Sequence, residues 1–327
     1  MGWYRTVGRP AFLALPPEAA HRVATALLGL PLGWRRIGGA PDDPSLVAEL
    51  AGIEVRNPIG LAAGFDKTCA HLDALGLLGF GYVVGGTITR APRRGNPKPR
   101  IVRYPQRRSM VNAMGLPNPG ASAAAANLAR RPRTAPRLVS VADEAVPDAV
   151  TTAELLAPHV DAIELNAGCP NVSWGRDRDN ERHLADLLDA LHAGVDVPVF
   201  VKVPPFTGSV ERDVVLALAS IAAERGAAGI TCANTRPHEE PRLAAGRGGL
   251  SGRVLSAGLP DMVAAVREAT GLPVNACGGV STTADVRACL DAGATTVQVY
   301  TALVYEGPGL VGDLCAGLLE RRVPSGA

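Results

Sequence analysis

The stretch VDAIELNAGCPNV, residues 160–172, joins a buried strand to a cluster of groups that can carry out chemistry. Residues 160–165 are apolar and short enough for an inner β-strand. Directly after them, Asn166 and Asn171 can each offer a hydrogen-bond donor and an acceptor to a planar amide-bearing ligand, and Cys169 can take or give a proton between them. In isolation, an inert buried cysteine flanked by turn-forming asparagines would be the better interpretation. The rest of the chain favours an active site.

The same rhythm of apolar strand, polar or Gly-rich loop and Ala/Leu-rich helix recurs from residue 57 onward. The expected strands are residues 59–63, 82–85, 137–141, 160–165, 197–203, 229–232, 273–276 and 296–300. Residues 180–192, 210–225 and 259–270 are examples of the expected helices. Continuous apolar strands that alternate with helices are typical of parallel sheets buried on both faces. Eight such units predict an α/β protein with a (β/α)8 TIM barrel, and a doubly wound sheet is the alternative because the pattern does not show closure.

We expect two parts in the chain, a helical extension over residues 1–45 and the barrel over residues 46–327. The sequence Pro16-Pro17-Glu18 is a helix-start signal, followed by an amphipathic run over residues 19–30. Its apolar side would carry Ala20, Val23, Leu27 and Leu28. This helix could pack on the barrel or rest on a membrane surface, and the pattern does not decide between the two.

Composition and charge limit the classes of function. With 327 residues, 47% hydrophobic, 4% aromatic and a net charge of +2, the chain has an ordinary globular composition. The near-neutral net charge argues against nucleic acid as a partner, although residues 90–108 are locally basic. The six cysteines have no spacing of a zinc site, so we expect no metal, reduced thiols and a cytoplasmic location. The apolar run at 11–15 is too short for a signal peptide or a membrane span.

In a TIM barrel the chemistry lies in the loops after the strands, and the unusual residues of this chain fall there. Gly278-Gly279 follows the seventh strand, and Tyr300-Thr301 follows the eighth. Barrels commonly bind phosphate at these two loops, because glycine lets backbone N–H groups approach the anion and a helix N-terminus follows. The sequence therefore predicts a phosphorylated cofactor.

Several longer motifs resemble one family, the dihydroorotate dehydrogenases, and in layout their class 2, quinone-dependent branch. The motifs are NPIGLAAGFDK at 57–67, GNPKPR at 95–100, NAMG at 112–115, GGLSG at 248–252 and QVYTALVYEGPG at 298–309. The resemblance implies an FMN enzyme of pyrimidine biosynthesis that oxidises (S)-dihydroorotate to orotate. Hydride would pass to flavin N5 and a proton to Cys169, and a quinone would reoxidise the flavin.

The resemblance and the loop positions together give a set of candidate residues. Candidate FMN contacts are Ala62, Ala63, Thr87, Asn112, Ser140, Lys202, Ser251, Gly252, Gly278, Gly279, Tyr300 and Thr301. Candidate contacts to a dihydropyrimidine substrate are Lys67, Asn112, Met114, Gly115, Leu116, Asn166, Asn171, Asn234 and Thr235. His21 and Arg103 stand where the family lines its quinone tunnel, which also implies peripheral contact with the inner face of the cell membrane.

Some positions depart from the class 2 pattern and keep other functions open. Cys169 and Val172 resemble class 1, where class 2 has a serine and a threonine relay. Leu116 stands in place of a phenylalanine, Ser140 in place of an asparagine that contacts the flavin, and the segment 236–247 is short. One alternative is a related flavoenzyme that acts on a different cyclic or enone substrate in specialised metabolism. Another is a barrel that binds a ligand without catalysis, which Lys67 and Cys169 argue against.

Overall fold

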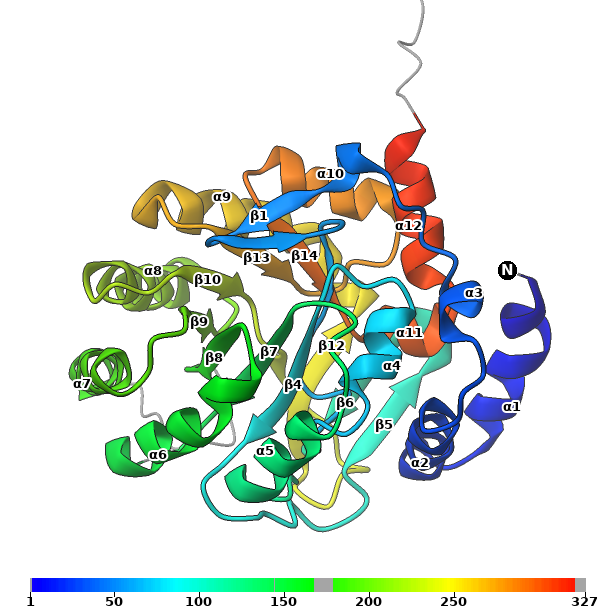
Figure 1. Cartoon of the computed structure of the whole chain (residues 1–327), viewed down its shortest axis with the longest axis horizontal. Helices are drawn as coiled ribbons and strands as arrows, with labels where there is room; N and C mark the ends of the chain where they lie inside the picture. The colour runs from blue at the N-terminus through cyan, green and yellow to red at the C-terminus, as the bar shows by residue number, and fades with distance from the viewer. Residues whose placement is uncertain (1, 144, 168–178, 321–327) are drawn as a thin grey trace, which may run out of the picture.

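A closed barrel of eight parallel strands forms the centre of the molecule (Figure 1). The computed structural model describes residues 2–143, 145–167 and 179–320. In chain order the barrel strands are β3 (Ile59–Leu61), β4 (Tyr82–Ile88), β7 (Arg137–Val141), β8 (Ala162–Asn166), β9 (Val199–Val203), β10 (Gly229–Cys232), β13 (Val274–Cys277) and β14 (Thr296–Val299). The sheet closes because β14 pairs with β3 in parallel, as Val297 does with Ile59. The TIM barrel prediction is confirmed, and all eight expected strands are present.

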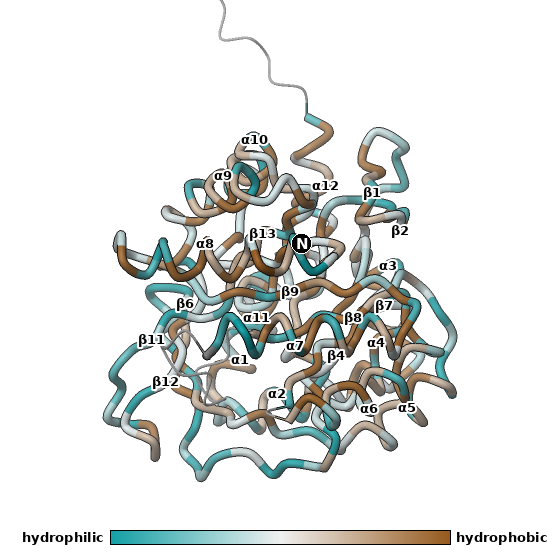
Figure 2. The backbone as a smooth tube through the Cα atoms, turned by 90° about the vertical axis from the view of Figure 1, so that its left-hand side faces the viewer, coloured by the Kyte–Doolittle hydropathy of each residue, from teal (hydrophilic) through white to brown (hydrophobic). Residues whose placement is uncertain are grey.

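Helices surround the barrel, as expected from the alternating pattern. They are α4 (Leu72–Leu77), α5 (Ala121–Ala129), α6 (Val146–Leu156), α7 (Asp179–Gly194), α8 (Ser209–Glu224), α9 (Leu259–Thr270), α10 (Thr283–Asp291), α11 (Thr301–Glu306) and α12 (Leu310–Leu319). Figure 2 shows hydrophobic and hydrophilic residues alternating along α7 and α8, typical of helices with one face on a sheet. The main apolar core lies between these helices and the strands.

Two β elements lie outside the barrel, and the sequence pattern did not predict either. A hairpin of β1 (Ala48–Leu50) and β2 (Ile53–Val55) packs its Leu50 and Val55 against Phe200 and other residues at the amino-terminal end of the barrel interior. A four-stranded antiparallel sheet has the order β11-β12-β6-β5. Its strands are β5 (Ile101–Tyr104), β6 (Ser109–Asn112), β11 (Arg236–Glu239) and β12 (Arg247–Gly252). The sheet therefore joins the loop after β4 to the loop after β10.

The first part of the chain is helical, as predicted, and packs beside the barrel next to β5 and α11 (Figure 1). Its helices are a π-helical turn (Tyr4–Gly8), α1 (Arg9–Ala14), α2 (Pro17–Leu28) and α3 (Trp34–Gly38). A 3-10 turn, Pro44–Leu46, follows these helices. Further along the chain there are 3-10 turns at Pro105–Arg107, Ala157–His159 and Arg253–Gly258. None of the helices in the described ranges is long and apolar enough to cross a membrane.

Ion pairs attach this segment to the barrel. Glu18, in the first turn of α2, accepts two hydrogen bonds from Arg100, at 3.1 and 3.0 Å, and lies 3.3 Å from the Lys98 amine. Burial alone would raise the pKa of Glu18, but these hydrogen bonds outweigh it and hold that pKa below its ordinary value. The Arg5 guanidinium lies 2.9 Å from the buried carboxylate of Glu306. Charged groups at residues 5 and 18 therefore attach the extension to the barrel.

The apolar side expected for α2 divides into two parts. Ala20 and Leu28 are buried against the protein, whereas Val23 is 43% exposed and Leu27 is 36% exposed. Only part of the expected apolar side therefore meets the barrel, and the other part is exposed. The exposed pair leaves an apolar strip on the outer side of α2.

Packing between β3 and β4 predicts that the stability of the protein is sensitive to substitution of Gly60. A Cβ atom at Gly60 would lie 2.3 Å from the Tyr82 ring, which fills the space beside the glycine. We expect Gly60→Ala to lower the free energy of unfolding by about 1–3 kcal/mol, the usual cost of overpacking a core. Equilibrium urea unfolding measures this change.

Gly258→Ala is the matched control, because a Cβ atom there would meet nothing within 4 Å and its φ is −91°. We expect a change of no more than about 0.5 kcal/mol. Equal effects of the two substitutions would contradict the packing argument.

Candidate active site

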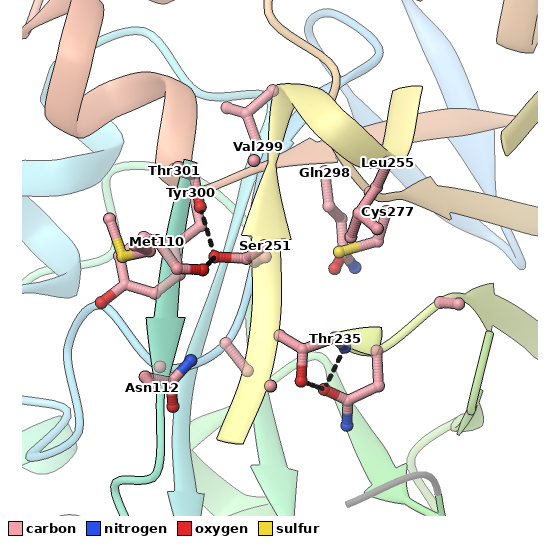
Figure 3. Close-up of a pocket in the computed structure, with 18 of the residues that line it drawn as sticks. Met110, Asn112, Thr235, Ser251, Leu255, Cys277, Gln298, Val299, Tyr300 and Thr301 are labelled. Atoms are coloured by element: carbon pink, nitrogen blue, oxygen red, sulfur yellow. Dashed lines mark hydrogen bonds between the residues drawn. The ribbon is translucent and has the colours of Figure 1, made fainter. Parts of the chain in front are cut away.

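A pocket opens at the carboxyl ends of the barrel strands, beneath the four-stranded sheet (Figure 3). Every barrel strand except β7 contributes a lining residue, from the strand itself or from the loop that follows it. From the sheet come Ile101, Met110, Asn112, Gly249, Ser251 and Gly252. Closure of the barrel thus brings together residues that are more than 200 positions apart, such as Ala62 and Thr301.

Most of the candidate residues line this pocket. From the candidate FMN set these are Ala62, Ala63, Thr87, Asn112, Lys202, Ser251, Gly252, Gly278, Gly279, Tyr300 and Thr301. From the candidate substrate set they are Lys67, Asn112, Met114, Leu116, Asn166, Asn234 and Thr235. Ser140 and Gly115 are not lining residues, and Cys169 and Asn171 lie outside the residues that the structure describes.

A chain of hydrogen bonds orients the carboxamides on one wall. The Asn166 amide donates to the Thr87 hydroxyl at 3.3 Å and accepts from the Asn234 amide at 3.0 Å. Asn234 in turn accepts from the backbone N–H of Thr235 at 2.8 Å. Ser140, fully buried behind this wall, lies 3.0 Å from the Thr87 hydroxyl. Ser140 therefore contacts the lining residue Thr87 and is not itself a lining residue, and its role as a flavin contact stays a prediction.

Lys67 brings a cation to the pocket. Its amine donates to the Gly64 carbonyl, and burial lowers the pKa of Lys67 to about 8. The side chain is therefore mostly charged at neutral pH. A cation in this position can hold an anionic ligand by a charge-assisted hydrogen bond.

Gly252 and Gly279, two other lining residues, allow backbone segments to approach one another closely. Gly252 has φ +96° and Gly279 has φ +80°, which residues with a side chain rarely adopt. A Cβ atom at Gly252 would lie 2.4 Å from the Arg108 carbonyl, and one at Gly279 would lie 2.6 Å from the Ser256 nitrogen. Next to them, the Thr301 hydroxyl donates to Ser251 at 3.0 Å (Figure 3). Bare backbone and hydroxyls at the start of α11 form a cradle suited to an anion such as phosphate.

Lys202 supplies a second cation, which is 6% exposed. Its amine lies 3.8 Å from the buried carboxylate of Glu164 on the neighbouring strand β8. Cys277 lines the pocket as well, and burial raises the pKa of its thiol, although Lys202 partly opposes that effect. Cys277 is therefore a neutral thiol at pH 7.

Sequence reasoning missed several lining residues. Cys277 and Gln298 could have been found, because each lies near the carboxyl end of a barrel strand, where access to the opening is expected. Ile101, Met110 and Gly249 gave no such signal, because they reach the pocket only through pairing of β6 with β5 and β12.

The two candidate quinone residues lie between the helical extension and the barrel. The ring of His21 packs edge-on against Phe65, with centroids 5.3 Å apart, and Phe65 packs against Tyr300 of the pocket at 5.7 Å. Burial, with help from Lys67, lowers the pKa of His21 to about 4, so this imidazole is neutral at pH 7. Arg103 donates to the carbonyls of Phe12, Leu13 and Leu15, and so caps the end of α1. A row of aromatic rings thus connects α2 with the pocket.

Comparisons with known proteins agree on one family. A family model described as "Dihydroorotate dehydrogenase" matches residues 45–321. A protein of Novosphingobium aromaticivorans named "Dihydroorotate dehydrogenase (quinone)" is 37% identical, over 96% of this chain and 94% of its own length. A protein of Leifsonia xyli with the same name is 39% identical, over 98% of this chain and 99% of its own length. The crystal structure of DHODH from Eimeria tenella in complex with ferulenol superposes with a TM-score of 0.81 at 28% identity, over 93% of this chain and 90% of that one.

Proposed function

The chain belongs to the dihydroorotate dehydrogenase family, and we propose that its pocket oxidises (S)-dihydroorotate to orotate, with FMN as cofactor and a quinone as electron acceptor. The observation that carries this proposal is the composition of the pocket. Its lining combines a lysine and oriented carboxamides with a group of glycines and hydroxyls. A carboxylated pyrimidine needs the lysine and carboxamides, and the phosphate of a flavin mononucleotide needs the glycines and hydroxyls.

The residues fit a flavin mononucleotide. Glycine at 252 and 279 lets the backbone segments pack closely, and the Ser251 and Thr301 hydroxyls lie beside them, so backbone N–H groups and small hydroxyls would meet the phosphate there. Lys202 and the Thr87 hydroxyl would meet the polar edge of the flavin ring, and Ser140 would hold Thr87 in place. Bound FMN supplies the hydride acceptor and passes the electrons to the quinone.

We assign substrate binding to the lysine and the carboxamides of the pocket. Lys67 would hold the carboxylate of dihydroorotate, and Asn112, Asn166, Asn171 and Asn234 would bind its two amide edges. Because the Asn166 amide is fixed by Thr87 and Asn234, its donor and acceptor are oriented before the substrate arrives. The site would be closed around the substrate ring by Met114, Gly115, Leu116 and Thr235.

Oxidation to orotate removes one hydride and one proton from adjacent carbons, and a C=C bond forms. We assign the proton to the Cys169 thiolate. A free thiol has a pKa of about 8.5, so a cysteine can act as a base near neutral pH without the relay that a serine requires. Val172 has no hydroxyl with which to form such a relay.

The helical extension is proposed as the route of the quinone. His21 with Phe65 and Tyr300 connects α2 to the pocket, and Arg103 holds the end of α1 beside this route. The extension carries exposed apolar side chains, which support a peripheral contact with the cytoplasmic face of the cell membrane, where quinones dissolve. They are Trp3, Val7, Leu15, Val23, Leu27, Leu30 and Leu32.

The decisive experiment tests cofactor and substrate together. We expect the protein to purify yellow with non-covalent FMN, and anaerobic titration with dihydroorotate to bleach the flavin absorbance. A colourless protein that does not take up FMN would contradict the oxidoreductase function. A yellow protein that dihydroorotate does not bleach would instead favour the related flavoenzyme with a different ring or enone substrate.

Lys67 should make substrate binding depend on pH. Its pKa is about 8 in the pocket, so the amine is charged below pH 8 and loses its proton above it. We expect the Kd of dihydroorotate or orotate to be constant below pH 8 and to rise, by up to tenfold per pH unit, above it. Lys67→Ala should weaken binding by about 1.5–3 kcal/mol, the value of a hydrogen bond to a charged group, and should abolish this pH dependence. Retention of the pH dependence in the variant would remove Lys67 from the carboxylate site.

Cys169 should be required for the chemical step but not for binding. We expect Cys169→Ala to retain FMN and to bind orotate, yet to slow flavin reduction by at least about 10²-fold, the usual size of a general-base effect. Cys169→Ser should restore little activity, because no relay supports the hydroxyl. Stopped-flow absorbance under anaerobic conditions gives this rate, and a wild-type rate in Cys169→Ala would exclude the thiol from the mechanism.

The extension should matter for quinone but not for dihydroorotate. We expect deletion of residues 1–40, or the double substitution Val23→Ser and Leu27→Ser on α2, to slow reoxidation by quinone while flavin reduction stays at the wild-type rate. The matched control is Val210→Ser with Val214→Ser, an exposed pair of the same spacing on α8. Equal loss of both half-reactions would mean that the extension only supports the fold.

A further inference from the structure

One carboxylate lies wholly inside the barrel, beneath the pocket. Glu164, in the middle of β8, has no exposed surface. Its Oε2 accepts from the Thr231 hydroxyl at 3.0 Å and from the Gln298 amide at 3.4 Å. Its Oε1 accepts no hydrogen bond and lies 3.8 Å from the Lys202 amine. A buried carboxylate is costly unless it is paired, so this position requires a physical reason.

A chain of hydrogen bonds inside the barrel is directed toward this carboxylate. Thr296 donates its hydroxyl proton to Asn275 at 2.6 Å, and the Asn275 amide donates to Thr231 at 3.3 Å. Since the proton of Thr296 is already used, the 2.8 Å contact between Thr296 and Tyr82 is a bond that the Tyr82 hydroxyl donates. Burial raises the pKa of Tyr82, which keeps that proton in place. Four donors in series thus end on Glu164, the arrangement that stabilises a negative charge.

Lys202 stands between this charge and the pocket. Lys202 is a lining residue of the pocket, whereas Glu164 is not. In the strand register Lys202 pairs with Asn166 on one side and with Thr231 on the other. The carboxylate can therefore influence a bound ligand through Lys202, through the lining residue Gln298 that donates to it, and through its electric field.

We propose that Glu164 is the counter-ion and positioning residue of Lys202, and that its charge lowers the midpoint potential of the flavin in the pocket. This inference rests on the proposed function, because it needs FMN in the pocket. A positive charge beside a flavin favours the added electrons, and charge near the ring is one of the means by which proteins tune it. Glu164 cancels part of the Lys202 charge, and the barrel interior screens this interaction far less than water would.

Glu164→Gln tests the proposal, because glutamine has almost the same size and can still accept from Thr231 but has no charge. We expect the ratio of reduced to oxidised flavin at a fixed potential to rise at least tenfold, which is about 30 mV for a two-electron couple. The measurement is anaerobic equilibration of the purified yellow protein with a dye of known potential. An unchanged potential in a folded, yellow variant would overturn the proposal, whereas a colourless wild-type protein would overturn the proposed function instead.

Glu240→Gln is the matched control. Glu240 is 3% exposed and lies 2.8 Å from the Arg242 guanidinium, so it is also a buried glutamate paired with a cation, but it is not a lining residue of the pocket. We expect its substitution to leave the flavin potential unchanged. A shift equal to that of Glu164→Gln would show a general effect of charge and would contradict the specific role of Glu164.

A second measurement does not depend on the folding of Glu164→Gln. Lys202→Gln leaves the Glu164 carboxylate buried without its counter-ion, whereas the double variant Glu164→Gln with Lys202→Gln has no buried charge. We expect the double variant to unfold at a higher urea concentration than Lys202→Gln alone. A double variant that is no more stable than Lys202→Gln would show that the two charges do not interact and would overturn the proposal.

Discussion

The closure of eight parallel strands into a barrel is the constraint from which the pocket follows. Parallel strands in a closed sheet all end on the same side, so the loops after β3, β10, β13 and β14 meet around one opening. The barrel closes through the pairing of β14 with β3, which are far apart in sequence. Without that pairing, Ala62 and Tyr300 would not share a pocket.

The interior of the barrel changes character along its axis. At the amino-terminal end, Phe200, Leu138 and the hairpin residues Leu50 and Val55 form a dry apolar layer. Above it lies a polar layer that runs from Tyr82 around the barrel to Glu164. The apolar layer excludes water, and this exclusion makes a buried ion pair influential where the ligand binds. The amino-terminal end of the barrel interior thus serves stability, and the carboxyl-terminal end serves ligand binding.

The four-stranded sheet has a different part in the molecule, because it covers the opening. Its strands come from the loops after β4 and β10, and pairing of β6 with β12 places Asn112 and Ser251 above the strand ends. The helical extension packs against the edge strand β5 of the same sheet, where Glu18 pairs with Arg100. The four-stranded sheet and the helical extension are therefore in direct contact. A ligand that enters beside α2 would meet both.

The sequence by itself determined eight strand and helix units of a parallel α/β fold, because parallel strands buried on both faces have an apolar signature that repeats with helices between. The closure of these strands into a barrel was decided by the pairing of β14 with β3. The sequence also determined most lining residues that follow the strands, such as Lys67, Asn166 and Thr301, because position after a strand decides access to the opening. It could not show that Ser140 lies behind Thr87, since that contact depends on the register between the neighbouring strands β4 and β7. Only the tertiary structure placed Met110 and Gly249 over the pocket and joined Tyr82 to Glu164, because these contacts depend on pairing between distant strands, which local sequence does not encode.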